Sequence, residues 1–333
     1  MTQRNNTCTM DKDAVLQRVR YYIQTIAENP VAGTPTGDVL EDTLGSVGKM
    51  IRPQLLLTCS SLGPEASEKL DRLCILAAMV ELTHLSSLIH DDIVDDAPVR
   101  RGNPSVQSKY GKDAAVYAGD FLISRIQYWQ AKEQLYAAGM RLAKTVEDMC
   151  IGEIGQDLCR YRLDVTADAY YQNIKGKTAS LFKTACAIGG AEAGCDENTV
   201  ATLEQFGQCL GIMFQLRDDL LDFLSTGQEA GKQTHKDFRD GIYTLPVLMA
   251  LQSEEGRAAL LPMMQANAEG SLSDGDIRRM EETVCRFGGV EATWEEIHRY
   301  CAEAHRLLDK LGSHEAVDTL KRMLDLLDKR ECP

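Results

Sequence analysis

The chain has 333 residues, of which 44% are hydrophobic and 26% are charged. That is enough apolar side chain to bury one large core or two modest ones. The formal net charge of −14 argues against nucleic acid or an anionic membrane surface as the main partner. An anionic substrate would also meet a repulsive field, so local cations or metal ions would have to reverse that field at any such site.

The cysteines and the apolar runs indicate where the protein works. Eleven cysteines are spread over the chain, an odd number with no CxxC pair, which favours reduced core residues over a disulfide framework or a zinc site. The polar N-terminus lacks the apolar core of a signal peptide. The longest apolar run, residues 73–80, ends at Glu81 and is far shorter than the roughly 20 residues of a membrane span. We therefore expect a cytoplasmic protein without stable membrane insertion.

Apolar residues recur at three- and four-residue spacing along most of the chain, which is the pattern of helices with one buried face. It predicts helices over residues 15–26, 70–93, 114–135, 140–158, 170–188, 200–224 and 293–311. Short polar breaks separate them at 28–37, 61–67, 101–105 and 190–198, and strand-like alternation is missing from the sequence. The sequence thus predicts one all-α domain over residues 1–333, a single large helical bundle whose residues 1–12 form a disordered tail.

An acidic cluster occurs twice, each time with carboxylates at i, i+1 and i+4. The two sets are Asp91, Asp92 and Asp95, and Asp218, Asp219 and Asp222. On a helix the first and last members of each set lie on one face, roughly 5–6 Å apart at Cβ. Two such faces on facing helices of a bundle would form an oxygen-lined slot. Hard divalent cations such as Mg²⁺ take oxygen ligands and share their coordination with substrate phosphates.

A single acidic cluster in an acidic protein is commonly just a solvated helix end. Here the residues before each cluster, such as Leu88 and Phe214, are apolar, which indicates buried helices. Buried carboxylates cost free energy unless they are paired or metal-bound. Arg100 and Arg101 also follow the first cluster within a turn and a loop, and paired guanidinium groups suit a diphosphate. The sequence therefore predicts a metal-bridged diphosphate site.

Residues 225–243, directly after the second acidic cluster, are polar, contain glycines and have no helical period. This segment is either a mobile loop that closes over the cluster or an ordinary surface connection. Its composition favours neither interpretation.

Motifs between residues 48 and 246 resemble, in the same order, those of the trans-prenyl diphosphate synthase family. They are GKMIRP at 48–53, HLSSLIHDDIVDDAPVRRG at 84–102, GQD at 155–157, KTA at 177–179, GIMFQLRDDLLD at 211–222, and GKxxxxD with TLP at 231–246. The resemblance implies the isoprenoid synthase type of helical bundle, with a central active-site cavity, and a homodimer. It also implies the reaction: an allylic diphosphate ionises, isopentenyl diphosphate attacks the cation, and a proton is lost to give an all-trans product five carbons longer.

The resemblance implies a role for each matching residue. On the side of the leaving diphosphate it implies three Mg²⁺ ions, bound by Asp91, Asp95 and Asp218 and supported by Asp92, Asp219 and Asp222. The cations on that diphosphate would be Arg100, Lys177 and Lys232, and its further contacts would be Thr178 and Gln215. The residues expected to carry the chemistry are Asp91, Asp95, Lys177 and Asp218.

Isopentenyl diphosphate must not ionise, so its diphosphate needs cations without metal. The residues that match the family's positions for this task are Lys49, Arg52, His84 and Arg101. Taken singly, Lys49 and Arg52 could be surface charges, and His84 could be a histidine satisfied within the core. The order of the motifs favours the functional interpretation.

The sequence departs from the family at three positions. Val47 replaces a usual glycine, His235 replaces a frequent glycine, and Ile242 replaces a common lysine. The loss of a lysine at 242 is expected to weaken diphosphate retention and to lower turnover more than it changes the reaction.

Product length depends on what blocks the tunnel below the first acidic cluster. The wall residues are small: Thr83, Ser86 and Ser87. Because one helical turn of ~5.4 Å is about the length of one isoprene unit, small residues here predict a product of at least twenty carbons. A facing helix could supply the floor instead, with Tyr117, Phe121 and Tyr128 as candidates.

Three alternatives remain. The chain could be the catalytic subunit of a heteromeric polyprenyl diphosphate synthase. It could be a class I terpene cyclase, although a cyclase has no second diphosphate for Lys49, Arg52 and Arg101 to hold. A non-catalytic partner subunit is disfavoured because both acidic clusters are intact.

Overall fold

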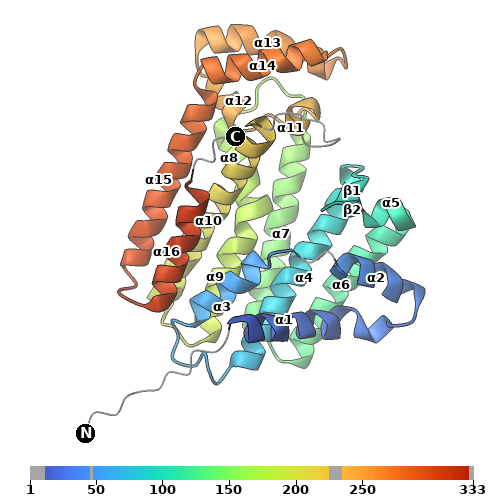
Figure 1. Cartoon of the computed structure of the whole chain (residues 1–333), viewed down its shortest axis with the longest axis vertical. Helices are drawn as coiled ribbons and strands as arrows, with labels where there is room; N and C mark the ends of the chain where they lie inside the picture. Colours follow the sequence, from blue (N-terminus) through green and yellow to red (C-terminus); the bar gives the residue numbers. More distant parts are fainter. Residues whose placement is uncertain (1–11, 46–47, 225–234, 330–333) are drawn as a thin grey trace. The chain divides into compact units, whose positions relative to one another are not determined.

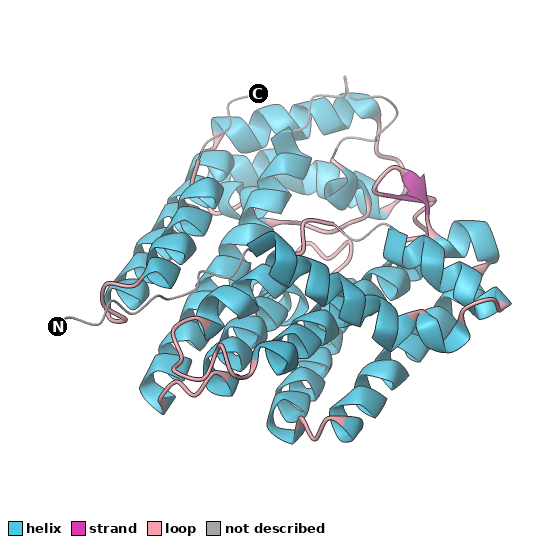
Figure 2. Cartoon of the chain, turned by 60° about the horizontal axis from the view of Figure 1, so that its bottom comes forward, coloured by secondary structure: helices cyan, strands magenta, loops and turns pink. Residues whose placement is uncertain are grey.

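The computed structural model of the chain describes residues 12–45, 48–224 and 235–329, which are almost entirely helical (Figures 1 and 2). Within these ranges the strands are β1 (Val99–Arg100) and β2 (Asn103–Pro104), which pair as one antiparallel hairpin. The chain divides into two compact units, Met1–Ala143 with Ala185–Glu197, and Lys144–Thr184 with Asn198–Pro333. The all-α class is confirmed, whereas a single domain over 1–333 stays a prediction.

The first unit is built around α4 (Leu70–Val94), in which every residue from 73 to 83 is buried. This helix contacts α1 (Lys12–Ala27), α3 (Ile51–Ser60) and α6 (Lys112–Lys132). The unit also contains η1 (Asn29–Val31), α2 (Pro35–Gly45), α5 (Val106–Tyr110), the first part of α7 (Tyr136–Leu158) and the last part of α9 (Ser180–Glu192). A helix covered on all sides explains why residues 73–83 are apolar almost throughout rather than amphipathic.

Among the described residues, α4 is the one helix long and apolar enough to cross a membrane by length and composition. Of its most apolar window, 78% is buried inside the protein, as in the core helix of a globular protein. Counting uninterrupted apolar residues in the sequence did not reveal this length, because Glu81 and His84 interrupt the run.

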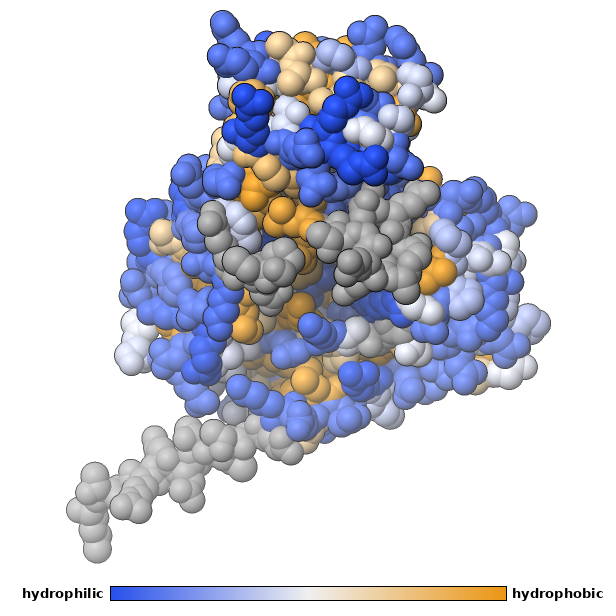
Figure 3. Space-filling model, turned by 45° about the horizontal axis from the view of Figure 1, so that its top comes forward, coloured by the Kyte–Doolittle hydropathy of each residue, from blue (hydrophilic) through white to orange (hydrophobic). Residues whose placement is uncertain are grey.

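The second unit combines the rest of α7, the start of α9 and most of α10 (Glu197–Leu224) with the C-terminal helices. Its other elements are α8 (Ala167–Ile174), the π-helical turn η2 (Lys175–Ala179), α11 (Lys236–Arg239), α12 (Leu245–Ala250), α13 (Glu254–Ala268), α14 (Asp274–Arg286), α15 (Gly289–Asp309) and α16 (Glu315–Leu327). Helices α13 and α14 lie side by side (Figure 1). Their outer face is mostly hydrophilic (Figure 3).

Long buried helices match the sequence prediction closely, whereas short polar ones were missed. The segments predicted at 70–93 and 200–224 are α4 and α10, each within a few residues. The segment predicted as one helix at 170–188 is instead α8, η2 and α9, because the π-helical turn shifts the helical period. Helix α2 begins inside the break predicted at 28–37, with Pro35 at its first position, where a missing N–H costs nothing.

The N-terminal tail predicted over residues 1–12 is shorter by at least one residue, because α1 begins at Lys12. Residues 1–11 lie outside the described part of the chain, as does Val47.

Candidate active site

The first acidic cluster lies at the C-terminal end of α4. Asp91 is half-buried, Asp95 follows the last helical residue and is exposed, and Asp92 points into the unit with 3% of its surface exposed. The carboxylate of Asp92 accepts a hydrogen bond of 2.9 Å from Nε of Arg100 and a second from the same guanidinium group. Asp92 is therefore neutralised from within the protein, and Asp91 and Asp95 are the members of the set that remain on the outer side of the helix end.

The β1–β2 hairpin presents Arg100 and Arg101 in different directions. Its two central residues, Arg101 and Gly102, have φ of 52° and 81°, as a two-residue hairpin turn with both residues at positive φ requires. Arg100 turns to Asp92. The guanidinium group of Arg101 lies so close to Gly48 that a Cβ there would stand 2.8 Å from its Nη1. Gly48 of the GKMIRP motif and Arg101 of the hairpin are therefore in close contact.

A cluster of positive charge surrounds His84 in the first unit. Burial, and then the guanidinium groups of Arg52, Arg101 and Arg100, lower the pKa of His84 to about 2, so its imidazole is neutral. Burial lowers the pKa of Arg52 to about 10, although the carboxylate of Glu81 opposes this change. Arg52 and Arg101, beside a neutral imidazole donor, can hold an anion without a metal.

Glu81 is the counter-charge of this cluster, and the sequence motifs did not identify it. It lies one turn before His84 on α4 and is 2% exposed. Burial raises the pKa of Glu81, while Arg52 and Arg101 oppose that rise. The signal in the sequence was an acidic residue at the end of an apolar run, three positions before a histidine and so on the same helical face. Lys49, the remaining predicted residue of this subsite, lies just before α3, and its carbonyl oxygen accepts a hydrogen bond from Gln54.

The second acidic cluster ends α10 and is held by a hydrogen-bond chain in the second unit. Asp219 is 3% exposed and accepts hydrogen bonds from the hydroxyl of Tyr170 and from Nε2 of Gln215, the latter at 2.8 Å. The hydroxyl of Thr178 donates in turn to Oε1 of Gln215 at 2.5 Å. The predicted substrate contacts Thr178 and Gln215 thus also orient the cluster. Tyr170 was missed by the sequence analysis, since a single tyrosine carries no spacing signal.

Negative charge accumulates around this cluster. Burial is the largest cause that raises the pKa of Asp219, to about 7. Desolvation and the carboxylate of Asp222 raise the pKa of Asp218, which is exposed. Burial, followed by the carboxylates of Asp219 and Asp222, raises the pKa of Asp237 to about 8. Carboxylates that repel one another at this distance are suitable ligands for a divalent cation, which would neutralise their charge.

Within the described ranges, no three Asp, Glu, His or Cys side chains already converge as a complete metal site. Mg²⁺ commonly takes one or two carboxylates and completes its shell with water and substrate phosphate oxygens. The residues of the second unit therefore fit a metal that arrives with a diphosphate, rather than an all-protein cage.

Lys177 lies in η2, the π-helical turn, a rare element that is frequent at functional sites. Helix α7 passes so close that a Cβ on Gly152 would lie 2.4 Å from the backbone nitrogen of Lys177. A Cβ on Gly176 would lie 2.4 Å from the carbonyl oxygen of Asp148. The two glycines thus permit α7 and η2 to pack closely, and Nζ of Lys177 lies 3.1 Å from Oε2 of Glu153 on α7.

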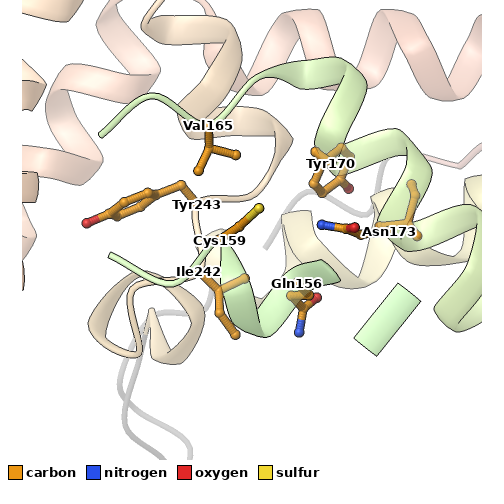
Figure 4. Close-up of a pocket in the computed structure, with 8 residues that line it drawn as sticks. Gln156, Cys159, Val165, Tyr170, Asn173, Ile242 and Tyr243 are labelled. Carbon is orange, nitrogen blue, oxygen red and sulfur yellow. The ribbon is translucent and has the colours of Figure 1, made fainter. Parts of the chain in front are cut away.

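A small pocket in the second unit is lined in part by Ile242 (Figure 4). Its lining residues are Gln156, Cys159, Val165, Tyr170, Asn173, Ile174, Ile242 and Tyr243. Ile242 gives this pocket an apolar wall, and Tyr170 connects the pocket to Asp219 through its hydroxyl group. No cation reaches the cluster from position 242. Lys232, the other predicted cation of this region, lies outside the described residues.

The predicted wall residues Thr83, Ser86 and Ser87 lie on α4, but their side chains differ in environment. Thr83 and Ser86 are buried, and the Ser86 hydroxyl donates to the carbonyl oxygen of Gly119 on α6 at 3.0 Å. Ser87 is half-buried and bonds its own helix at His84. Of the candidates for an opposite floor, Tyr117 and Tyr128 are exposed and Phe121 is half-buried.

Comparison with known proteins shows to which family the chain belongs. Residues 36–277 match the family model described as polyprenyl synthetase. A heptaprenyl diphosphate synthase component 2 of Geobacillus stearothermophilus is 35% identical, over 89% of this chain and 90% of that protein. A short chain isoprenyl diphosphate synthase of Methanothermobacter thermautotrophicus is 32% identical, over 87% of this chain and 89% of that protein.

Solved structures show the same fold. A decaprenyl diphosphate synthase from Rhodobacter capsulatus has a TM-score of 0.85 and 30% identity, over 96% of this chain and 97% of that one. A polyprenyl synthase from Caulobacter crescentus, in complex with calcium and isoprenyl diphosphate, has a TM-score of 0.85 and 28% identity, over 96% and 95% of the two chains. The fold is the all-α isoprenoid synthase fold, and the protein is an enzyme that transfers prenyl groups. The chain belongs to the polyprenyl synthetase family.

Proposed function

We propose that this enzyme condenses isopentenyl diphosphate with a geranyl, farnesyl or geranylgeranyl diphosphate primer to give an all-trans polyprenyl diphosphate of twenty carbons or more. The observation that carries the proposal is a pair of chemically different residue sets. One is the cationic cluster of Arg52, His84 and Arg101, and the other consists of carboxylates with Lys177. A cyclase has no second diphosphate that would need the cationic cluster.

The cationic cluster suits the diphosphate that must stay intact. Guanidinium groups bind phosphate oxygens through paired N–H donors, and they do not weaken the carbon–oxygen bond as a Lewis acid does. The neutral imidazole of His84 adds a hydrogen bond without adding charge. Glu81 offsets the positive charge of Arg52 and Arg101.

The carboxylate sets suit the diphosphate that must leave. Asp91, Asp95 and Asp218 would hold Mg²⁺, and bound metal supplies Lewis-acid neutralisation of the leaving group. Thr178, Gln215 and Tyr170 keep Asp219 in place beside Asp218. The carbon–oxygen bond of the primer breaks, the double bond of isopentenyl diphosphate forms the new carbon–carbon bond, and the proton then lost goes to the released diphosphate.

Mg²⁺ is the proposed cofactor, with three ions bound together with the allylic diphosphate. The all-oxygen ligand set favours a hard cation, and the Caulobacter crescentus relative is described in complex with calcium. The nine described cysteines are free thiols, and five of them are buried. Free thiols support a location in the reducing cytoplasm.

We further propose that the chain works as a homodimer, with a heteromeric synthase as the alternative. Large hydrophobic side chains are exposed on the part of the first unit formed by α6 and α7, among them Tyr117 at 72% and Met140 at 74%. The alternative draws support from the relative described as component 2 of a heptaprenyl diphosphate synthase. Mass photometry of the pure chain, with elongation measured on the same sample, separates the two. A dimer that elongates alone favours the homodimer.

Elongation itself is tested with the pure protein, Mg²⁺, isopentenyl diphosphate and farnesyl diphosphate, with product length read by mass spectrometry. The expected result is a ladder of all-trans products that ends at one length of at least twenty carbons. If no allylic primer is extended by the lone chain, although the protein is folded and binds Mg²⁺, the elongation proposal is wrong for this chain alone.

Replacing Ser86 by phenylalanine is expected to shorten the product and to lower the unfolding midpoint. The new ring must displace α6, because the Ser86 hydroxyl contacts the Gly119 carbonyl oxygen. Such overpacking typically costs about 1–3 kcal/mol. Ser87→Phe is the matched variant, since Ser87 is half-buried and bonds only its own helix. An unchanged product distribution in both variants would rule out this wall as the stop.

A further inference from the structure

His235 lies beside the end of the second acidic cluster and has an unusual backbone conformation. Its φ and ψ are 55° and 43°, in the left-handed region, where glycine is at ease and other residues are uncommon. A non-glycine residue stays in this strained conformation only when its side chain is held by specific contacts.

The imidazole of His235 has specific partners inside the second unit. The residue is 4% exposed, and its ring packs edge-on against Phe223 with 5.5 Å between centroids. Its Nε2 lies 3.4 Å from Oε2 of Glu281 on α14. The ring therefore joins the end of α10, next to Asp222, to the helical hairpin formed by α13 and α14.

The two residues after His235 meet the acidic cluster directly. The backbone N–H of Lys236 points at Oδ1 of Asp222 at 3.4 Å, and that of Asp237 points at Oδ2 at 3.3 Å. The segment then runs on to Asp237, whose carboxyl group interacts with Asp218, Asp219 and Asp222. The position of His235 thus determines where both Asp222 and Asp237 can lie.

The rest of the segment is fastened to the same helical hairpin. Nδ2 of Asn267 on α13 donates to the carbonyl oxygen of Phe238 at 2.6 Å. Arg239 forms an ion pair of 2.8 Å with Asp274 at the start of α14. Residues 235–243 are therefore an anchored segment rather than a free loop, while residues 225–234 lie outside the described part of the chain.

We propose that His235 is a positioning residue of the second acidic cluster: through Phe223 and Glu281 it anchors residues 235–237, so that Asp222 and Asp237 are held beside Asp218 and Asp219. Helices α13 and α14 then act on the active site indirectly, because they hold residues 235–237 in place. The proposal deepens the proposed function, because the cluster that it positions is the one that would bind the leaving diphosphate with its metal.

The first test is hydrogen exchange of the protein without substrate or metal, which does not depend on the reaction. His235→Gly keeps the left-handed backbone and removes the ring, and Glu281→Ala removes the ring's partner. In both variants the amides of residues 236–240 are expected to exchange at least about fivefold faster, with the unfolding midpoint little changed. Glu282→Ala, an exposed neighbour on the same helix, is the matched control and should exchange like the parent protein.

The second test is a split between Michaelis constants. Both variants are expected to raise the KM for the allylic diphosphate and the Mg²⁺ concentration for half-maximal rate severalfold, and to leave the KM for isopentenyl diphosphate unchanged. If His235 only stabilised the fold, the KM values for the two substrates would change alike. Parent-like exchange at 236–240 in His235→Gly, or equal effects of Glu281→Ala and Glu282→Ala, would overturn the proposal. If the parent protein does not elongate at all, the exchange data still decide it.

Discussion

Replacing Asp218 by asparagine is expected to lower kcat/KM by about 10²- to 10⁴-fold, because metal-ion catalysis supplies several kcal/mol and each 1.36 kcal/mol is tenfold. The folded protein should not lose stability, because burial of the carboxyl group and then the carboxylate of Asp222 raise the pKa of Asp218, so that its negative charge is not stabilised by the fold. Steady-state rates as a function of Mg²⁺ concentration, together with thermal unfolding, measure both effects.

Glu197→Gln is the control for this substitution, since Glu197 is an exposed carboxylate in the first turn of the same helix. It should leave kcat/KM unchanged. An Asp218→Asn variant with parental kcat/KM would show that this carboxylate does not assist the departure of the diphosphate. A large loss of stability in that variant would contradict the electrostatic description of the cluster.

The second large effect is expected at Glu81. Glu81→Leu removes a buried carboxylate whose charge opposes those of Arg52 and Arg101. Because Arg52 is half-buried and Arg101 is exposed, the loss of stability should stay below the about 3–5 kcal/mol that breaking a fully buried charge pair costs. Denaturant unfolding of the purified variant measures this loss. Inorganic pyrophosphate, added with EDTA to exclude metal, should restore more of the midpoint in Glu81→Leu than it adds to the parent protein, because the anion replaces the missing charge.

Glu68→Leu, at an exposed position just before α4, is the control and should unfold like the parent protein. If Glu81→Leu is as stable as the parent, the cations around His84 do not depend on this carboxylate. If pyrophosphate in EDTA stabilises neither protein, the cluster is not an anion site and the assignment of the isopentenyl diphosphate subsite is wrong.

The sequence was most informative where burial and spacing act together. Helices α4 and α10 are long and apolar, and a helix with so much buried surface leaves a period that a pattern can detect. The cationic cluster was predicted as a set of residues, and the structure brings Arg52, His84 and Arg101 within electrostatic reach of one another. Thr178 and Gln215, both predicted as substrate contacts, prove to be joined by a hydrogen bond.

What the sequence could not predict depends on local geometry that leaves no period. The hairpin turns its two arginines apart, so that Arg100 pairs with Asp92, and the assignment of Arg100 to the diphosphate stays a prediction. Gly152 and Gly176 allow α7 to pack closely against the π-helical turn at Lys177, and neither glycine is recognisable in advance as a contact between helices. The roles of the individual site residues in substrate and metal binding stay predictions.

The central claim of this account is that the chain holds two diphosphates in two chemically different ways. Calorimetric titration of isopentenyl diphosphate and of farnesyl diphosphate, each in Mg²⁺ and each in EDTA, tests it most directly. We predict that isopentenyl diphosphate binds equally well in both conditions and that farnesyl diphosphate binds tightly only with Mg²⁺. Loss of isopentenyl diphosphate binding in EDTA, or tight farnesyl diphosphate binding without metal, would contradict the claim.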